Sequence, residues 1–470
     1  GSFTSEGTFD SAIKKLDYLK ELGITAIEIM PVAAFPGTRN WGYDGVSMYA
    51  VQESYGGPNS LKRFVDTAHR KGLAVVLDVV YNHLGNEGNY LAKFGPYFTA
   101  KHQTPWGNAI NFDDRGCEHV REYIVDNALY WVREYHIDGL RMDAVQTIKD
   151  DSPTHVLAEL SDNVQQFASQ SNREVTLVAE SDENSPRYVR PRERGGYGLN
   201  GVWSDDFHHA AHALFTGERE GYYQDFGKVE DLVKALNEGF AFQGQMFKFW
   251  GESRGESPGD MPKEAHVICV QNHDQVGNRA LGERLTSLVP LGTRKLIAAL
   301  LLLAPETPLI WMGQEYDEKN PFQFFTDYGD PGLQKAVSEG RRNEFKDFKS
   351  FGDEFPDPQD PATFDRSKLN WQHSPEQKEM LKWYRRLLCL RKELYGERQR
   401  TARAESQNAT SIELVIPAEQ PMARLAGDWG NSPKAESSDW KVLLAAEADG
   451  MWVTILAPES FAANLKRLCE

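Results

Sequence analysis

Cysteine is scarce in this chain of 470 residues, which holds only Cys117, Cys269, Cys389 and Cys469. The four are far apart and form no Cys-x-x-Cys pair, which argues against a zinc site and a dense disulfide framework. Reduced thiols in a cytoplasm fit this spacing best. Long apolar runs and a signal peptide are lacking too, so we expect a cytoplasmic protein with no membrane partner.

Positive charge is also in short supply. The chain has 52 lysines and arginines against 69 acidic residues, which leaves a net charge of −17. Such a field repels phosphate backbones, so nucleic acid is not an expected partner, whereas a neutral ligand such as a sugar is indifferent to it. Apolar residues make up 40% of the chain, enough for a packed core, and the length favours one large domain with a smaller one.

Short apolar segments alternate with helical ones along most of the chain. The strands that we expect cover residues 24–30, 73–80, 139–142, 175–179, 202–204, 266–270 and 308–311, and the helices residues 10–22, 61–70, 120–135, 153–169, 294–303 and 376–394. This alternation predicts a parallel sheet. An open doubly wound sheet needs an early glycine-rich phosphate loop, which is missing, so we expect a (β/α)8 TIM barrel. An eighth strand belongs before the first helix, where we expect it to be shortened or absent.

Two regions interrupt the alternation. Residues 81–117 are rich in glycine, asparagine, proline and aromatics without a clear helix, and structureless loops of this length usually carry function. Residues 320–368 are acidic, and their pattern predicts a region rich in loops. After residue 394 the pattern changes to short strands, which we expect over residues 411–416, 440–446 and 451–456. We therefore expect a catalytic barrel over residues 1–394 and a small C-terminal β domain over residues 395–470.

Acidic residues stand at the carboxyl ends of four expected strands. They are Asp78, Asp143, Glu180 and Asp274, and His83, Arg141 and His273 lie beside them in the sequence. Barrel enzymes place their catalytic groups at this face, so we expect the side chains to converge. A single acidic residue in such a place is more often structural, and we interpret Asp78 in this way, as tying down the loop that follows it.

Paired carboxylates suit the cleavage of an acetal. The reaction needs a proton for the leaving oxygen and an anion to meet the oxocarbenium-like carbon, and two carboxyl groups in different environments supply both. Arg141 stands two residues before Asp143, on the same side of a strand, where its charge would keep Asp143 ionised. Clustered aspartate and histidine could also bind a metal, but the tight His-x-His and Asp-x-Asp spacings are missing, so we expect no metal.

These motifs resemble the four signature regions of the α-amylase family, glycoside hydrolase family 13. The resemblance covers the expected barrel and implies a retaining mechanism without a prosthetic group, in which Asp143 is the nucleophile, Glu180 the general acid/base and Asp274 the stabiliser of the transition state. It also makes residues 81–117 the family's domain B. The substrate-binding residues that it implies are Tyr43 as a stacking platform, Asp44, His83, Arg141, Asp205, Asp206, His209, His273 and Asn278.

Finer stretches resemble one subfamily, namely residues 30–36, 94–99, 203–209 and 324–328. Its members hydrolyse the α-1,4 bond next to the terminal trehalose unit of maltooligosyltrehalose and release trehalose. They usually carry an N-terminal β-sandwich domain, which we expect to be absent here. Two alternatives stay open: another enzyme of the family, such as a glycogen branching or debranching enzyme, and a non-catalytic barrel used for binding.

Overall fold

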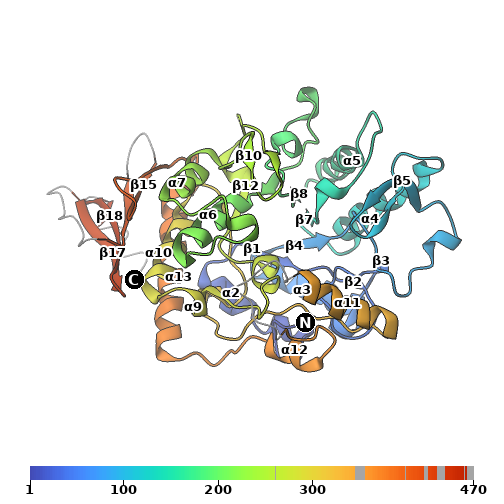
Figure 1. Cartoon of the computed structure of the whole chain (residues 1–470), viewed down its shortest axis with the longest axis horizontal. Coiled ribbons are helices and arrows are strands. Elements are labelled where there is room, and N and C mark those ends of the chain that lie inside the picture. Colours follow the sequence, from blue (N-terminus) through green and yellow to red (C-terminus); the bar gives the residue numbers. More distant parts are fainter. Residues whose placement is uncertain are drawn as a thin grey trace.

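Seven parallel strands form the central sheet of the computed structural model, which describes residues 1–259, 261–344, 355–396, 398–417, 422–430, 440–459 and 461–462 (Figure 1). In spatial order they are β1 (Ala26–Ile29), β4 (Ala74–Val79), β7 (Gly139–Met142), β8 (Thr176–Ala179), β9 (Gly201–Trp203), β12 (His266–Cys269) and β13 (Thr307–Leu309). The sheet curls into a barrel, which confirms the predicted α/β fold class. The seven expected strands all form, with ends that differ by one or two residues.

The central strands are mostly apolar because the sheet is covered on both faces, and the charged residues Asp78 on β4 and Arg141 on β7 are exceptions. Every residue of β7 is buried, and so are the last three residues of β4. Parallel strands between two layers need such continuous apolar runs, which is why the sequence predicts them well.

Helices cover the outside of the barrel, and shorter ones connect its elements. The α-helices are α1 (Phe9–Ile13), α2 (Leu16–Leu22), α3 (Gly57–Arg70), α4 (Cys117–Glu134), α5 (Val156–Gln170), α6 (Asp205–Thr216), α7 (Val229–Glu238), α8 (His273–Gly277), α9 (Leu285–Leu288), α10 (Leu291–Leu303), α11 (Pro331–Glu344), α12 (Pro361–Arg366) and α13 (Pro375–Tyr395). The start of helix α13 is fixed by its local sequence: Pro375 is the first helical residue, and Ser374 and Gln377 form a reciprocal capping box.

Several elements differ from the expectations. The helix predicted over residues 10–22 is two helices, divided at Lys14–Lys15. Residues 81–117 contain a hairpin of β5 (Phe98–Thr104) and β6 (Gly107–Ile110), and a further strand pair, β2 (Ala33–Ala34) and β3 (Ser47–Val51), lies near it. Helices α11 and α12 occupy a region predicted as a loop. Most of α11 faces solvent, and the side that faces the protein mixes apolar with polar residues, so it carries no continuous apolar stripe. The residues on that side are Leu333, Gln334, Val337, Ser338 and Arg341.

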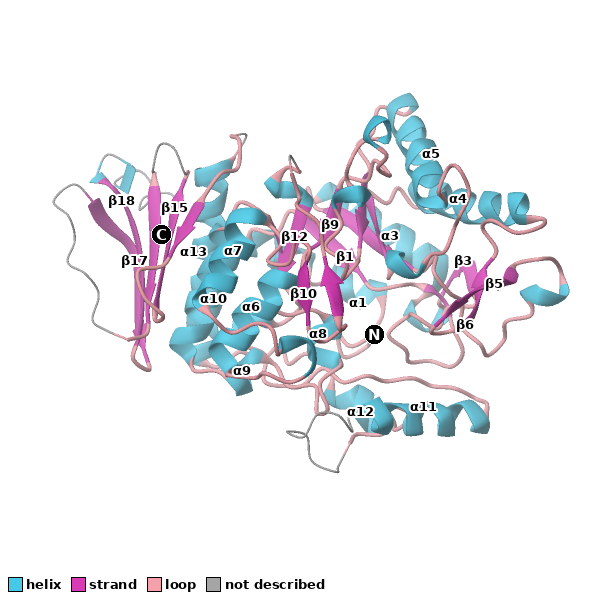
Figure 2. Ribbon diagram, turned by 45° about the horizontal axis from the view of Figure 1, so that its top comes forward, coloured by secondary structure: helices cyan, strands magenta, loops and turns pink. Residues whose placement is uncertain are grey.

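A second, antiparallel sheet of five strands lies at one edge of the molecule (Figure 2). In spatial order its strands are β14 (Arg403–Glu405), β15 (Ser411–Ile416), β16 (Ala423–Asp428), β18 (Met451–Pro458) and β17 (Trp440–Ala448), and β10 (Gln245–Phe247) pairs with β11 (Glu252–Arg254) elsewhere. The five-stranded sheet shares one hydrophobic cluster with α10 and α13. The predicted division into two domains at residue 394 stays a prediction.

The cysteines depart from the expectation in one case. Cys389 is disulfide-bonded, so the prediction of reduced thiols is wrong for it, because separation along the chain does not measure distance in the fold. Cys117 and Cys269 are free thiols, and Cys469 lies outside the described residues. Among the helices that the structure describes, none is long and apolar enough to cross a membrane. The cytoplasmic location stays a prediction.

Candidate active site

The guanidinium of Arg141 is the centre of the site. Arg141 lies on β7 and is fully buried, and its Nη1 donates to both carboxylate oxygens of Asp78 at 2.8 Å and to Oδ1 of Asp143 at 2.9 Å. Its Nη2 lies 3.4 Å from Oε2 of Glu180. The ring of Trp203 lies beneath it, 4.4 Å from the guanidinium carbon. Groups from the ends of four neighbouring strands therefore meet at one side chain.

Asp143 and Glu180 lie at the ends of β7 and β8. Oδ2 of Asp143 accepts a hydrogen bond from Nδ2 of Asn82 at 3.0 Å, and Oε2 of Glu180 accepts one from the backbone N–H of Ala144 at 2.5 Å. Burial raises the pKa of Glu180 well above its ordinary value, and the charge of Asp143 adds to this while Arg141 opposes it. A carboxyl group that keeps its proton at neutral pH can act as a general acid.

Asp274 is the most accessible of the three predicted catalytic carboxylates. The exposed fraction of its side chain is 40%, against 12% for Asp143 and 15% for Glu180. It lies in the first turn of α8, which begins four residues after β12 ends, and its Oδ1 accepts a hydrogen bond from Nδ2 of Asn278 at 3.3 Å. Burial raises the pKa of Asp274, while the charges of Arg141 and Arg341 lower it.

Tyr43 links Asp78 to His273. The Tyr43 hydroxyl donates to Oδ2 of Asp78 at 2.6 Å, and Nε2 of His273 lies 2.8 Å from the same hydroxyl. Because the hydroxyl proton is used, His273 must donate through Nε2–H, which fits a neutral ring: burial lowers its pKa to about 3. The prediction that Asp78 ties down the following loop is therefore wrong, because its carboxylate holds Arg141 and Tyr43 instead.

His83 is held by protein groups on several sides. Its Nδ1 lies 2.8 Å from Oδ1 of Asn82, and its Nε2 lies 2.9 Å from the carbonyl oxygen of Tyr43. The ring stacks on Trp106 at 4.1 Å between centroids and 3° between planes. With both nitrogens engaged, His83 has no donor left for a sugar in this arrangement, so its predicted contact with substrate stays a prediction.

Asp206 is saturated by protein donors. It accepts hydrogen bonds from Nη1 of Arg254 at 2.8 Å, from Nδ2 of Asn184 at 2.7 Å, and from the backbone N–H groups of Ala241 and Phe242 at 2.7 and 3.0 Å. Its side chain is fully buried. These donors leave Asp206 in surroundings typical of a structural carboxylate, and its predicted contact with substrate stays a prediction.

The remaining predicted residues lie in different surroundings. Burial, opposed by Arg254, raises the pKa of Asp205 to about 7, and the charge of Asp274 contributes to this increase. His209 is buried against Tyr222, and its Nδ1 has no hydrogen-bond partner among the described residues. Asp44 accepts a hydrogen bond from Asn40 at 2.6 Å.

Three residues of the described chain could hold a metal ion, namely His102, Asp113 and Asp151. Nζ of Lys101 already contacts both carboxylates, at 2.8 Å for Asp113 and 3.2 Å for Asp151. Its ammonium group supplies the positive charge that an ion would bring. None of these residues is among the predicted site residues.

Three further residues of the site were not predicted. Asn82 lies between Asp78 and His83, two residues that the sequence analysis considered, so its position in this motif could have indicated a place in the site. Trp203 lies within a predicted strand but offers no chemistry that the sequence reveals. Arg341 comes from α11, outside every motif, and no sequence signal pointed to it.

Comparisons with known proteins agree with this geometry. The family described as "Alpha amylase, catalytic domain" matches residues 2–106 and 114–395. A malto-oligosyltrehalose trehalohydrolase of Saccharolobus solfataricus is 51% identical over 84% of this chain and 68% of its own length, so the chain spans about two thirds of that relative. A 1,4-alpha-glucan branching enzyme of Corynebacterium jeikeium is 32% identical over 49% of this chain and 35% of its own. The crystal structure of a putative alpha amylase from Salmonella typhimurium has a TM-score of 0.87 and 42% identity, covering 97% of this chain and 80% of that one.

Proposed function

The chain belongs to the α-amylase family, among the malto-oligosyltrehalose trehalohydrolases, and on this premise we propose that it hydrolyses the α-1,4 bond next to the terminal trehalose unit of maltooligosyltrehalose and releases trehalose. Identity of 51% to a relative of that name supports the substrate, whereas the branching enzyme matches only half of the chain.

The observation that carries the chemistry is the sharing of Arg141 between two carboxyl groups. Its Nη1 bonds Asp143 at 2.9 Å, and its Nη2 lies farther from Glu180, at 3.4 Å. The closer contact favours an anionic Asp143, since an adjacent positive charge stabilises the ionised form. Burial favours the protonated form of Glu180. One group is therefore prepared as a nucleophile and the other as an acid.

The reaction follows in two displacements. Glu180 gives its proton to the glycosidic oxygen as the bond between that oxygen and C1 breaks, and an oxygen of Asp143 forms a bond to C1. In the second step Glu180 takes a proton from water, the water oxygen bonds to C1, and the carboxylate of Asp143 leaves. Asp274, the most exposed of the three, binds the hydroxyls of the sugar as its ring distorts.

Analysis of the products formed from maltooligosyltrehalose tests this proposal. We expect trehalose and the shortened glucan as the main products, with the new reducing end in the α configuration. Chain transfer without trehalose would assign the protein to the branching enzymes instead. Binding of the substrate without any product would favour a non-catalytic barrel.

A further inference from the structure

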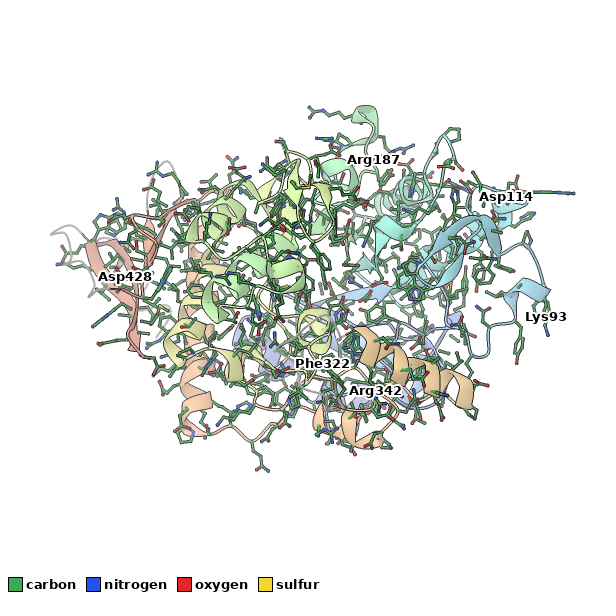
Figure 3. All side chains as sticks on the ribbon, in the orientation of Figure 1. Lys93, Asp114, Arg187, Phe322, Arg342 and Asp428 are labelled. Atoms are coloured by element: carbon green, nitrogen blue, oxygen red, sulfur yellow. The ribbon has the colours of Figure 1, made fainter. Side chains whose placement is uncertain are left out.

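Helix α11 delivers one side chain to the site from a distant part of the sequence. The helix lies along the edge of the barrel, and Figure 3 labels Arg342 near its end. Most of its side chains are exposed or only partly buried. Two side-chain hydrogen bonds connect the first part of α11 to neighbouring segments. Nε2 of Gln334 donates to the carbonyl oxygen of Tyr328 at 2.5 Å, and Oγ of Ser338 donates to Asp357 at 2.8 Å.

Arg341 makes the inward contacts of this helix. Its Nη1 donates to Oδ1 of Asn278 at 2.9 Å, and its Nη2 donates to the carbonyl oxygen of Gly277 at 2.5 Å. The guanidinium carbon lies 5.1 Å from the centre of the Phe324 ring. Gly277 is the last residue of α8, the short helix that carries Asp274. These contacts place the guanidinium at the C-terminal end of α8, whose N-terminal end is capped by Asn272.

Asn278 connects Arg341 to Asp274. A guanidinium can only donate, so the amide oxygen of Asn278 must face Arg341 and its NH₂ group must face the carboxylate. This is the observed orientation, with Nδ2 of Asn278 lying 3.3 Å from Oδ1 of Asp274. The amide cannot turn over while Arg341 is in place.

We propose that Arg341 is a positioning residue for the hydrolysis: acting through Asn278 and the end of α8, it orients the carboxylate of Asp274 towards the substrate and helps to keep it charged. The proposal rests on the role of Asp274 in the proposed function. It adds a helix without any recognisable motif to the parts of the chain that support catalysis.

Charge gives the proposal a signature that a purely structural role lacks. Two cations act on Asp274, Arg141 from β7 and Arg341 from α11, and both lower its pKa against the effect of burial. The other titratable groups that interact with Asp274 are Glu180, Asp205, Tyr43, Tyr222, Cys269 and His273. Removing the charge of Arg341 raises the pKa of Asp274 further. The acid side of the profile of kcat/KM against pH then moves to higher pH.

The test compares Arg341→Gln and Arg341→Lys with Arg342→Gln, the neighbouring exposed arginine of the same helix. In Arg341→Gln we expect kcat for trehalose release to fall by about tenfold or more, the size expected for loss of a charged hydrogen bond, with a smaller change in KM. The acid limb should also move upwards. Arg341→Lys should restore the position of the acid limb but only part of kcat, because an ammonium cannot reproduce the forked contacts. Arg342→Gln should match the unmodified protein in both respects.

A binding measurement separates this proposal from the proposed function. Calorimetric titration with maltotriose should show weaker binding to Arg341→Gln than to Arg342→Gln, whether or not the protein releases trehalose. Equal behaviour of the two variants in rate, pH profile and affinity overturns the role of Arg341. Equal impairment of both also overturns it, because it would show a general disturbance of α11. Failure of the unmodified protein to release trehalose refutes the proposed function, and the affinities then decide the role of Arg341.

Discussion

Two nitrogen atoms of the Arg141 guanidinium donate no hydrogen bond to the described residues. Its Nε and Nη2 have no hydrogen-bond partner among the described residues, although the side chain is fully buried. Buried donors without partners are costly, and a new anion beside them recovers part of that cost. Glu180, 3.4 Å from Nη2, becomes such an anion when it gives up its proton. The site is thus arranged to favour the charge that forms on Glu180 during cleavage.

The two carboxyl groups that we propose as nucleophile and general acid, Asp143 and Glu180, should respond differently to a change of leaving group. We expect Asp143→Asn and Glu180→Gln to lower kcat on maltooligosyltrehalose by roughly a thousandfold or more, with smaller effects on binding. Fluoride leaves without a proton, so on α-maltosyl fluoride Glu180→Gln should keep much of its first step while Asp143→Asn stays inactive. Steady-state rates measure the loss on maltooligosyltrehalose. The burst of fluoride released in the first turnover measures the first step on α-maltosyl fluoride, because Glu180→Gln also lacks the base that the second step needs. If Asp143→Asn regained activity on α-maltosyl fluoride, Asp143 would be the general acid and Glu180 the nucleophile.

The pH dependence follows from the raised pKa of Glu180. In the proposed mechanism the active form of the free enzyme carries a proton on Glu180, so kcat/KM should fall as the pH rises through the raised pKa of this group, at a higher pH than for a glutamate in water. The fall at low pH reflects the protonation of carboxylates that must be ionised, including Asp274. A profile of kcat/KM that is flat from acid to alkali would contradict catalysis by paired carboxyl groups.

At the scale of elements, the parts of the site that the sequence predicted share one property. Asp143 and Glu180 directly follow apolar strands, and Asp274 comes five residues after the end of β12. Parallel strands bring their carboxyl ends to one face, so local pattern and general topology place the three together. Arg254 and Arg341 could not be found in this way. Each reaches its partner across more than 45 residues of sequence, and only the packing of β11 and α11 brings the groups together.

The β10–β11 hairpin depends on one buried ion pair. Arg254 on β11 donates to Asp206 at 2.8 Å, and neither side chain is more than 1% exposed. Arg254→Met would leave the carboxylate of Asp206 buried without a countercharge, so we expect a loss of about 3–5 kcal/mol in the free energy of unfolding. Urea denaturation followed by circular dichroism measures this loss.

A surface ion pair provides the control for this prediction. Lys14 and Glu6 lie 3.5 Å apart with side chains 70% and 53% exposed, so Lys14→Met should leave the urea midpoint unchanged. If Arg254→Met were as stable as this control, the buried pair would not hold the hairpin in place.

At the scale of the whole molecule, the barrel and the C-terminal sheet share their packing. From Leu296 to Leu303 helix α10 is apolar and buried on all sides, because it packs on β16, β17 and β18 and shares a hydrophobic cluster with Ile268 of the barrel strand β12. The sequence predicted most of the barrel and three of the five strands of this sheet. It could not predict that the two share a core, because an all-apolar helix does not show which partner covers which face.

The contact between Gly427 and Leu296 tests this shared core. Gly427 lies on β16, and a Cβ atom added there would lie 2.4 Å from Cδ1 of Leu296 on α10. Gly427→Ala should therefore destabilise the protein by about 1–3 kcal/mol through overpacking, and Leu296→Ala by about 2–5 kcal/mol through the cavity that it leaves. In the double variant the new methyl enters that cavity, so the loss should be smaller than the sum of the two. Urea denaturation of the four proteins, followed in parallel by enzymatic activity, gives the coupling energy. Additive losses, or retention of activity after the sheet has unfolded, would show that the sheet is an independent unit.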